Sequence, residues 1–138
     1  MLNASSVLAA LPAETDCLFH LAGDTGFWRP NNVYQHAVNV GGTRNVLAAA
    51  AAKAVPKIVY TSTIGVYGES FHGIDERAPQ HGRRSRIGYI RSKAEAEEVV
   101  RDYVRRGLDV TIMNPCNIVG RHDRKNWARM FRMIVEGT

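Results

Sequence analysis

The sequence predicts an α/β fold in which three parallel strands are joined by crossover helices. Three short apolar runs, rich in β-branched residues, occupy positions 17–22, 57–63 and 109–114 of the 138 residues. Between them lie two longer segments, 32–54 and 89–106, whose apolar or small residues recur at helical spacing. Strands that alternate with helices favour right-handed crossovers and a parallel sheet.

Capping residues and prolines set the expected element boundaries in the first half. Asn3 can cap a short helix that ends before Pro12, and the first strand follows at 17–22. We expect a loop at 24–30. Asn31 or Asn32 can then cap a long helix that runs to about residue 54, and Pro56 opens the second strand.

The second half continues the alternation. A polar, turn-forming stretch at 69–86 precedes a helix over 89–106, with Gly107 as its cap, and the third strand begins at Asp109. An amphipathic helix is expected last, because its apolar residues stand at i, i+3, i+4 and i+7: Trp127, Met130, Phe131 and Ile134.

Composition indicates a soluble globular protein. The chain is 45% hydrophobic and 22% charged, and no apolar run approaches the ~20 residues of a membrane span. The N-terminus lacks the pattern of a signal peptide. Cys17 falls in a predicted strand and Cys116 in a loop, so we expect no disulfide and a cytoplasmic location.

The net charge of +5 and the pI near 9.6 raise the question of an anionic partner. Two basic groups stand out: Arg83, Arg84, Arg86 and Arg91, then Arg121, Arg124, Lys125, Arg129 and Arg132. They are most simply a solvated face, or they attract an anionic cofactor or substrate. We expect no nucleic-acid partner, because no aromatic-interleaved motif accompanies them. We also expect no metal, because the histidines lack ligand spacing: His20, His36, His72, His81 and His122.

Tyr89 and Lys93 are the candidate acid/base pair. Four residues apart on a helix, they share one face, and a nearby ammonium would lower the pKa of the phenol. The second strand ends in a hydroxyl cluster at 61–63, which could orient a substrate oxygen. Ala22–Gly23 and the turn-rich segment 115–120 follow the other two strands. Ligands of open α/β sheets lie beyond such carboxyl ends.

Five motifs, in order, resemble the extended short-chain dehydrogenase/reductase superfamily, and within it the NAD-dependent epimerase/dehydratase, dihydroflavonol-reductase-like branch. They are His20-Leu21-Ala22-Gly23, Asn39 to Leu47, Thr61 to Gly68, the pair Tyr89 and Lys93, and Asn114 to Gly120. The resemblance covers most of residues 15–125. It implies that the three strands are the second half of a doubly wound, Rossmann-like parallel sheet.

The resemblance also implies a function: NAD- or NADP-dependent hydride transfer at an alcohol or carbonyl carbon. The expected catalytic residues are Thr63 on the substrate oxygen, Tyr89 as general acid/base, Lys93 on the nicotinamide ribose, and Asn39 as a brace of the active-site helix. The expected cofactor-binding residues are Ala22, Gly23, Thr61, Tyr89, Lys93, Pro115 and Asn117. Ser62 is the less favoured hydroxyl, because alternation along the strand points it elsewhere.

The implied partners are a small alcohol or carbonyl compound, or a nucleotide sugar, and a second copy of the chain. In relatives, the helices that correspond to 32–54 and 89–106 pair across a two-fold axis. Here the alanine-rich surface at 48–54 would permit close approach, so we expect a homodimer. The edge of the strand at 17–22 is the competing contact.

The departures from the family pattern point to a fragment. No Gly-x-Gly-x-x-Gly or Gly-x-x-Gly-x-x-Gly turn is present, although a pyrophosphate needs such a turn at a helix N-terminus. We therefore expect residues 1–138 to be a partial NAD(P)-binding domain, without the glycine-rich half or the substrate lobe. Asn114 stands where many relatives carry arginine, and Thr63 where they often carry serine. The alternatives are a nucleotide-sensing relative and a truncated, non-catalytic interaction module.

Overall fold

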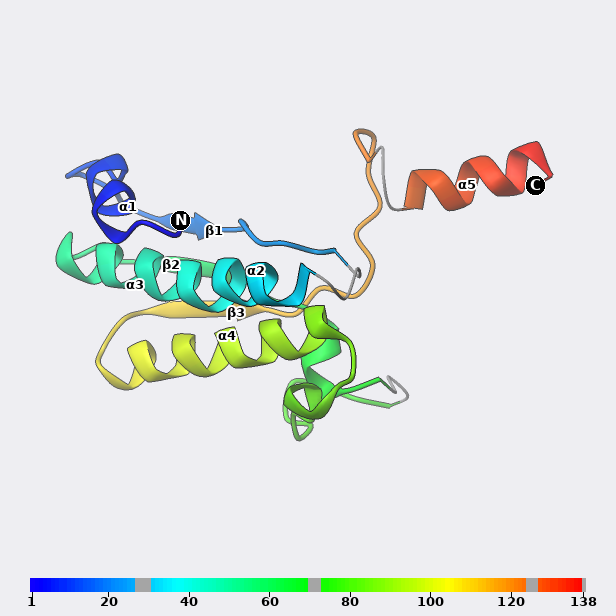
Figure 1. Ribbon diagram of the computed structural model, residues 1–138. Helices are drawn as coiled ribbons and strands as arrows, with labels where there is room; N and C mark the ends of the chain where they lie inside the picture. Colours follow the sequence, from blue (N-terminus) through cyan, green and yellow to red (C-terminus); the bar gives the residue numbers. More distant parts are fainter. Residues whose placement is uncertain (27–30, 70–72, 124–126, 138) are drawn as a thin grey trace.

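A computed structural model of the chain has the predicted three-stranded parallel sheet (Figure 1). The structure describes residues 1–26, 31–69, 73–123 and 127–137. The strands are β1 (Leu18–His20), β2 (Ile58–Thr61) and β3 (Val110–Met113), in the order β1-β2-β3. Their register aligns His20 with Tyr60 and Tyr60 with Ile112, so the three carboxyl ends meet at one edge of the sheet.

Each strand is shorter than its apolar run. The strand that was predicted at 17–22 has only three residues, because β1 stops at His20 and Leu21 is 68% exposed. The second strand, β2, ends at Thr61, and the residues that follow turn away from the direction of the strand. The Thr63 side chain accepts a hydrogen bond from the Gly65 amide and so caps a 3-10 helix, η3 (Ile64–Tyr67), which the sequence pattern did not indicate.

The first helices follow the predicted caps in part. Asn3 caps α1 (Ala4–Ala10) through a 3.0 Å bond from the Ser6 amide, as expected. The long helix is α2 (Asn32–His36), then a π-helical segment η2 (Ala37–Gly41), then α3 (Gly42–Ala52). These form one rod (Figure 1). Asn31 precedes the rod, but its side chain makes no capping bond.

The remaining helices agree with the predicted segments. A 3-10 turn, η4 (Gly82–Arg84), leads into α4 (Gly88–Arg105), and Gly107 follows with a φ of 100°, a value that favours glycine. Helix α5 (Trp127–Glu136) extends away from the sheet and the other helices (Figure 1). Among the described residues, no helix has the length and apolar character to cross a membrane.

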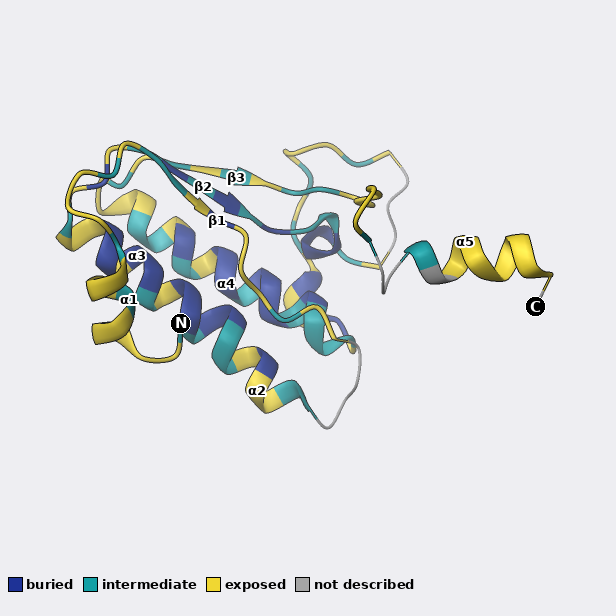
Figure 2. Cartoon of the chain, turned by 90° about the horizontal axis from the view of Figure 1, so that it is seen from above, coloured by how far each residue is buried: buried dark blue, intermediate teal, exposed yellow. Residues whose placement is uncertain are grey.

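One face of the sheet is covered by helices, with α3 and α4 packed side by side on it and α5 apart from it (Figure 2). Ile58 and Tyr60 point from β2 into this layer and are fully buried. The other face is open, and Phe19 and Met113 are 64% and 53% exposed there. The buried core consists of Val40, Leu47, Ala50, Val55, Ile58, Tyr60, Ala96 and Val100.

The alanine-rich segment is not one uniform surface. Ala49 and Ala50 are buried in the core, because they face the sheet, whereas Ala48, Ala51 and Ala52 are exposed. The expectation of a surface over 48–54 is therefore wrong for its two buried members. A contact with a second copy would have to use the outward positions.

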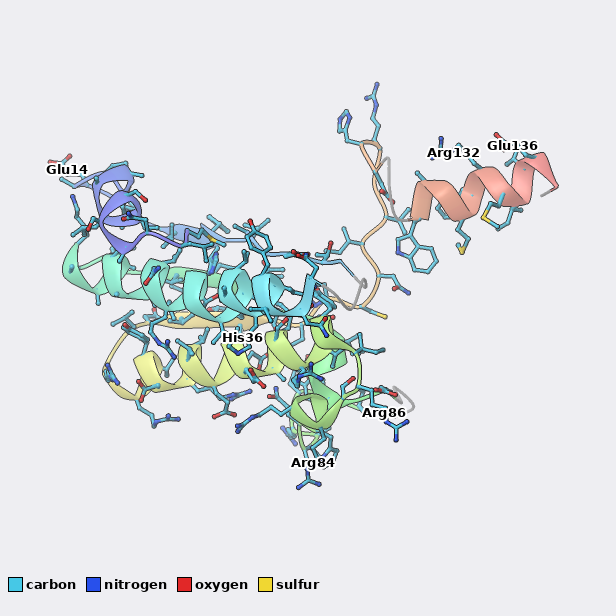
Figure 3. All side chains as sticks on the ribbon, in the orientation of Figure 1. Glu14, His36, Arg84, Arg86, Arg132 and Glu136 are labelled. Atoms are coloured by element: carbon cyan, nitrogen blue, oxygen red, sulfur yellow. The ribbon has the colours of Figure 1, made fainter. Side chains whose placement is uncertain are left out.

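The two basic groups lie apart. Arg84 and Arg86 project from the segment before α4, whereas Arg132 lies on α5, away from the rest of the chain (Figure 3). They do not merge into one surface. Arg124, Lys125 and His72, and positions 27–30 of the expected loop, lie outside the described residues, as does the side chain of Arg129.

Candidate functional site

A pocket of about 210 Å³ opens where the carboxyl ends of the strands meet the start of α4. It is smaller than the ~300–1,000 Å³ that holds a whole drug-sized ligand, so it suits one part of a larger molecule. Its lining residues are Leu21, Gly23, Thr25, Thr61, Ser62, Thr63, Tyr89, Lys93, Pro115, Cys116 and Ile118.

Tyr89 and Thr63 are neighbours in the lining of this pocket. Tyr89 is the second residue of α4, and Thr63 follows β2. Burial raises the pKa of Tyr89, and a hydrogen bond with the Thr63 side chain opposes that rise. The phenol is therefore protonated at neutral pH. The prediction that the pKa of Tyr89 is lowered is therefore wrong, because the loss of hydration on burial is the larger effect on this phenol.

Lys93 is one turn further along α4 and only 6% exposed. Its ammonium group donates a 2.7 Å hydrogen bond to the Thr61 carbonyl and lies 4.5 Å from the centre of the Tyr60 ring. Burial lowers the pKa of Lys93 to about 8, and the Glu97 charge opposes this shift. The lysine is thus held against the end of β2, with hydrogens still available for a ligand.

Asn39 is buried in the π-helical segment η2 and contacts α4, the helix that it was expected to brace. Its amide nitrogen donates to Ser92 Oγ and to the Asp24 carbonyl, both at 2.9 Å. Its oxygen accepts from the Asp24 amide at 2.8 Å. Ser92 Oγ in turn donates to the Tyr89 carbonyl at 2.8 Å. This chain of bonds ties the loop after β1 to the first turn of α4.

Gly23 lies between Asn39 and the pocket. A Cβ at this position would stand 3.1 Å from Asn39 Oδ1, which is tighter than an ordinary contact. The absence of a side chain therefore lets the backbone pass close to both the pocket and the brace.

Five of the seven residues expected to bind the cofactor line this pocket. Of the expected cofactor-binding residues, Gly23, Thr61, Tyr89, Lys93 and Pro115 line the pocket, whereas Ala22 and Asn117 do not. Both exceptions lie outside regular structure, where an apolar pattern gives no direction for a side chain.

Ser62, the hydroxyl that the sequence analysis favours less than Thr63, also belongs to the pocket lining. It is only 3% exposed, because the alternation of buried and half-buried residues along β2 continues to Thr63 and turns Ser62 to the same side as Ile58 and Tyr60. Within the described part of the chain, its buried Oγ has no hydrogen-bond partner. Leu21, Cys116 and Ile118 also line the pocket and belong to two of the five motifs, whereas Thr25 lies outside them.

Behind Lys93 lies a buried polar pair. His20 is 3% exposed, and its Nε2 is 3.0 Å from Thr43 Oγ1. Burial lowers the pKa of His20 to about 4, and the Lys93 charge adds to the shift. His20 is therefore a neutral residue of the interior. In the described ranges, no cluster of three or more histidine, cysteine, aspartate or glutamate residues could hold a metal ion.

The family model described as "NAD dependent epimerase/dehydratase family" matches residues 1–138. Among curated proteins, N-acetyl-alpha-D-glucosaminyl-diphospho-ditrans,octacis-undecaprenol 4-epimerase of Escherichia coli O157:H7 is 38% identical over 111 residues. That match takes in 78% of this chain and 32% of the epimerase.

Two solved structures have the same fold over 99% of this chain. DesIV, a dTDP-glucose 4,6-dehydratase from Streptomyces venezuelae with NAD and TYD bound, has a TM-score of 0.85 and 28% identity, and 43% of it is matched. RMD from Pseudomonas aeruginosa, complexed with NADPH, has a TM-score of 0.79 and 26% identity, and 49% of it is matched. The chain thus spans about a third of the curated relative and less than half of each structure.

The buried neutral His20 predicts acid sensitivity. The unfolded histidine takes up a proton below about pH 6.5, whereas the folded one does so only near 4, so stability is lost as the pH falls through this range. Between pH 7 and 5 we expect His20 to cost about 2 kcal/mol of unfolding free energy. Urea denaturation at each pH, monitored by circular dichroism, measures this free energy of unfolding.

The variant His20→Gln should lose this part of the pH dependence. His122→Gln is the matched control, because His122 is exposed. An equal loss of stability between pH 7 and 5 in the wild type and His20→Gln would show that His20 is not the sensitive group.

Proposed function

Because this chain belongs to the NAD-dependent epimerase/dehydratase family, we propose that its protein is an NAD(P)-dependent oxidoreductase or epimerase of the short-chain dehydrogenase type. The reaction would be hydride transfer at an alcohol or carbonyl carbon. The observation that carries the proposal is the meeting of Thr63, Tyr89 and Lys93 at one pocket. Since the chain spans a third of its curated relative, this activity is proposed for the whole protein.

The pocket fits the nicotinamide ribose end of NAD or NADP. Its size suits part of a dinucleotide, and the partly buried hydroxyl residues Thr61 and Thr63 line it. Gly23, Thr61, Lys93 and Pro115 would hold this end. When bound, the cofactor would supply the hydride chemistry. The adenine and pyrophosphate would need a glycine-rich turn, for which this sequence has no motif.

Tyr89 would act as the proton donor in the direction of reduction. Its raised pKa keeps the phenol protonated at neutral pH, so it can give a proton to a substrate oxygen that gains negative charge. The Thr63 hydroxyl, which is paired with it, would donate to the same oxygen. In the direction of oxidation, Tyr89 would take that proton back.

Lys93 would bind the ribose hydroxyls. One of its three N–H groups is used by the Thr61 carbonyl, which leaves donors that can turn towards the pocket. Asn39 would act through Ser92, by fixing the first turn of α4 and hence the position of Tyr89. The hydrogen bonds of Lys93 and Asn39 agree with these two roles.

The substrate would be a small alcohol or carbonyl compound or a nucleotide sugar. The named relatives support this class: DesIV is a dTDP-glucose dehydratase, and the E. coli protein is an epimerase of a diphospho-linked amino sugar. Cys17 and Cys116 are free, which agrees with a cytoplasmic location.

A second copy would pack against the outward face of the α2–α3 rod and α4. The rod presents small residues there at helical spacing: Ala37, Gly41 and Ala48. A Cβ at Gly41 would meet nothing within 4 Å, so the backbone is open to close approach. A two-fold axis through this face would use the same patch on both copies.

The catalytic proposal predicts a large effect of Tyr89→Phe. The test uses a longer protein, in which this chain is joined to a glycine-rich nucleotide-binding unit. Loss of a positioned acid/base should lower kcat by roughly 10²-fold or more. Tyr103→Phe, on the same helix but outside the pocket, is the control and should keep its kcat. Wild-type kcat in Tyr89→Phe would eliminate the proposed role.

The dimer proposal predicts that Ala48→Glu gives monomers, because it places a charge at an exposed position of the helix face. Sedimentation velocity measures the mass. Ala13→Glu is equally exposed but lies outside the helix face, and it should remain dimeric. An unchanged dimer in Ala48→Glu would point to the edge of β1 instead, and a monomeric wild type would reject both contacts.

A further inference from the structure

Lys93 is contacted at two points by consecutive residues of β2. Its ammonium group donates a 2.7 Å hydrogen bond to the Thr61 carbonyl and lies 4.5 Å from the centre of the Tyr60 ring. A cation within about 6 Å of the centre of an aromatic ring is attracted by the negative face of the ring, and the attraction is strongest where water is excluded. Tyr60 is 0% exposed and Lys93 is 6% exposed, so this contact is shielded from water.

The Tyr60 ring is itself packed against β1. The register of the sheet sets Tyr60 opposite His20, and the centres of the two rings lie 5.4 Å apart with their planes at 54°. His20 Nε2 is in turn 3.0 Å from Thr43 Oγ1 on α3. The contacts from Thr43 through His20 and Tyr60 to Lys93 therefore join α3, β1, β2 and α4, and they leave the Tyr60 ring in one place.

The ring of Tyr60, and not its hydroxyl, is the part that contacts Lys93. Thr43 lies near the hydroxyl, but no hydrogen bond of ordinary geometry joins the two groups. Burial raises the pKa of Tyr60, so the phenol stays neutral at pH 7. An electron-rich ring at this position would therefore make the contact with the ammonium group, with or without the phenol oxygen.

We propose that Tyr60 is a positioning residue of this site: its ring face holds the Lys93 ammonium group at the end of β2, beside the Thr61 carbonyl. Thr61 takes one of the three N–H groups of Lys93, and the ring covers a second side of the ammonium group. The N–H groups that remain then have fewer directions open to them. The inference rests on the proposed function only for what Lys93 then binds.

Other titratable groups near Lys93 are His20 from β1, and Tyr89 and Glu97 within one turn on its own helix. Burial lowers the pKa of His20 and raises the pKa of Tyr89, so both are neutral at pH 7. The Glu97 charge raises the pKa of Lys93. A test of Tyr60 must leave these side chains in place and change only the ring at position 60.

The test compares rings of one shape and opposite charge distribution in the 138-residue chain. Lys93 is titrated by NMR of ¹³Cε-labelled lysine, and the wild-type midpoint should lie at about 8. Tyr60→Phe keeps the electron-rich face and should keep this midpoint. Tyr60→pentafluorophenylalanine keeps the shape of the phenylalanine ring and reverses the charge on its face, so the midpoint should fall by about one pH unit.

Tyr103→pentafluorophenylalanine is the matched control. The Tyr103 ring is on the same helix as Lys93, but it lies outside the pocket and its centre is 5.3 Å from the Arg106 guanidinium group. This variant should leave the Lys93 midpoint unchanged.

The wild-type chain gives a second measurement, which needs no variant to fold. The Hε protons of Lys93 should resonate upfield of those of Lys57, whose side chain is 40% exposed, because the ring current of Tyr60 shields protons above its face. Equal midpoints in the Tyr60→Phe and Tyr60→pentafluorophenylalanine variants, or unshifted Hε protons of Lys93 in the wild type, would overturn the proposal. Neither measurement requires turnover, so each is independent of the kcat measurement on Tyr89→Phe.

Discussion

The burial of the Lys93 ammonium group is the constraint on which the site depends. A buried charge must find its partners inside the protein, and Lys93 finds the Thr61 carbonyl and the face of Tyr60. Both partners lie on β2, so they fix how α4 is rotated on the sheet. With that rotation set, Tyr89 stands one turn earlier, over the hydroxyl of Thr63.

A second constraint comes from the rod formed by α2, η2 and α3. Its π-helical turn contains Asn39, and π-turns inside helices are frequent at functional sites. The buried amide of Asn39 holds the Asp24 backbone on one side and Ser92 on the other. The loop after β1 and the start of α4 are thereby joined, and Gly23 and Tyr89, one from each, line the same pocket.

The parts of this arrangement that depend on local sequence could be predicted. Apolar runs and caps gave the strands and helices, and the spacing of Tyr89 and Lys93 placed them on one face. The details that failed depend on tertiary contacts. Where β1 stops decides that Leu21, and not Ala22, lines the pocket. The pKa of Tyr89 is raised because the side chain is buried, and burial is a tertiary property. Likewise, Glu97 accepts hydrogen bonds from Gln80 and Asn114, each 17 positions away in the sequence.

The central claim is that this chain carries the nicotinamide end of a dinucleotide site. NMR titration of the chain with nicotinamide mononucleotide, and separately with adenosine diphosphate, tests it most directly. The account predicts weak binding of nicotinamide mononucleotide, with shifts at the amides of Thr61, Thr63 and Cys116, and no shifts there with adenosine diphosphate. Shifts at these amides with adenosine diphosphate, and none with nicotinamide mononucleotide, would contradict it.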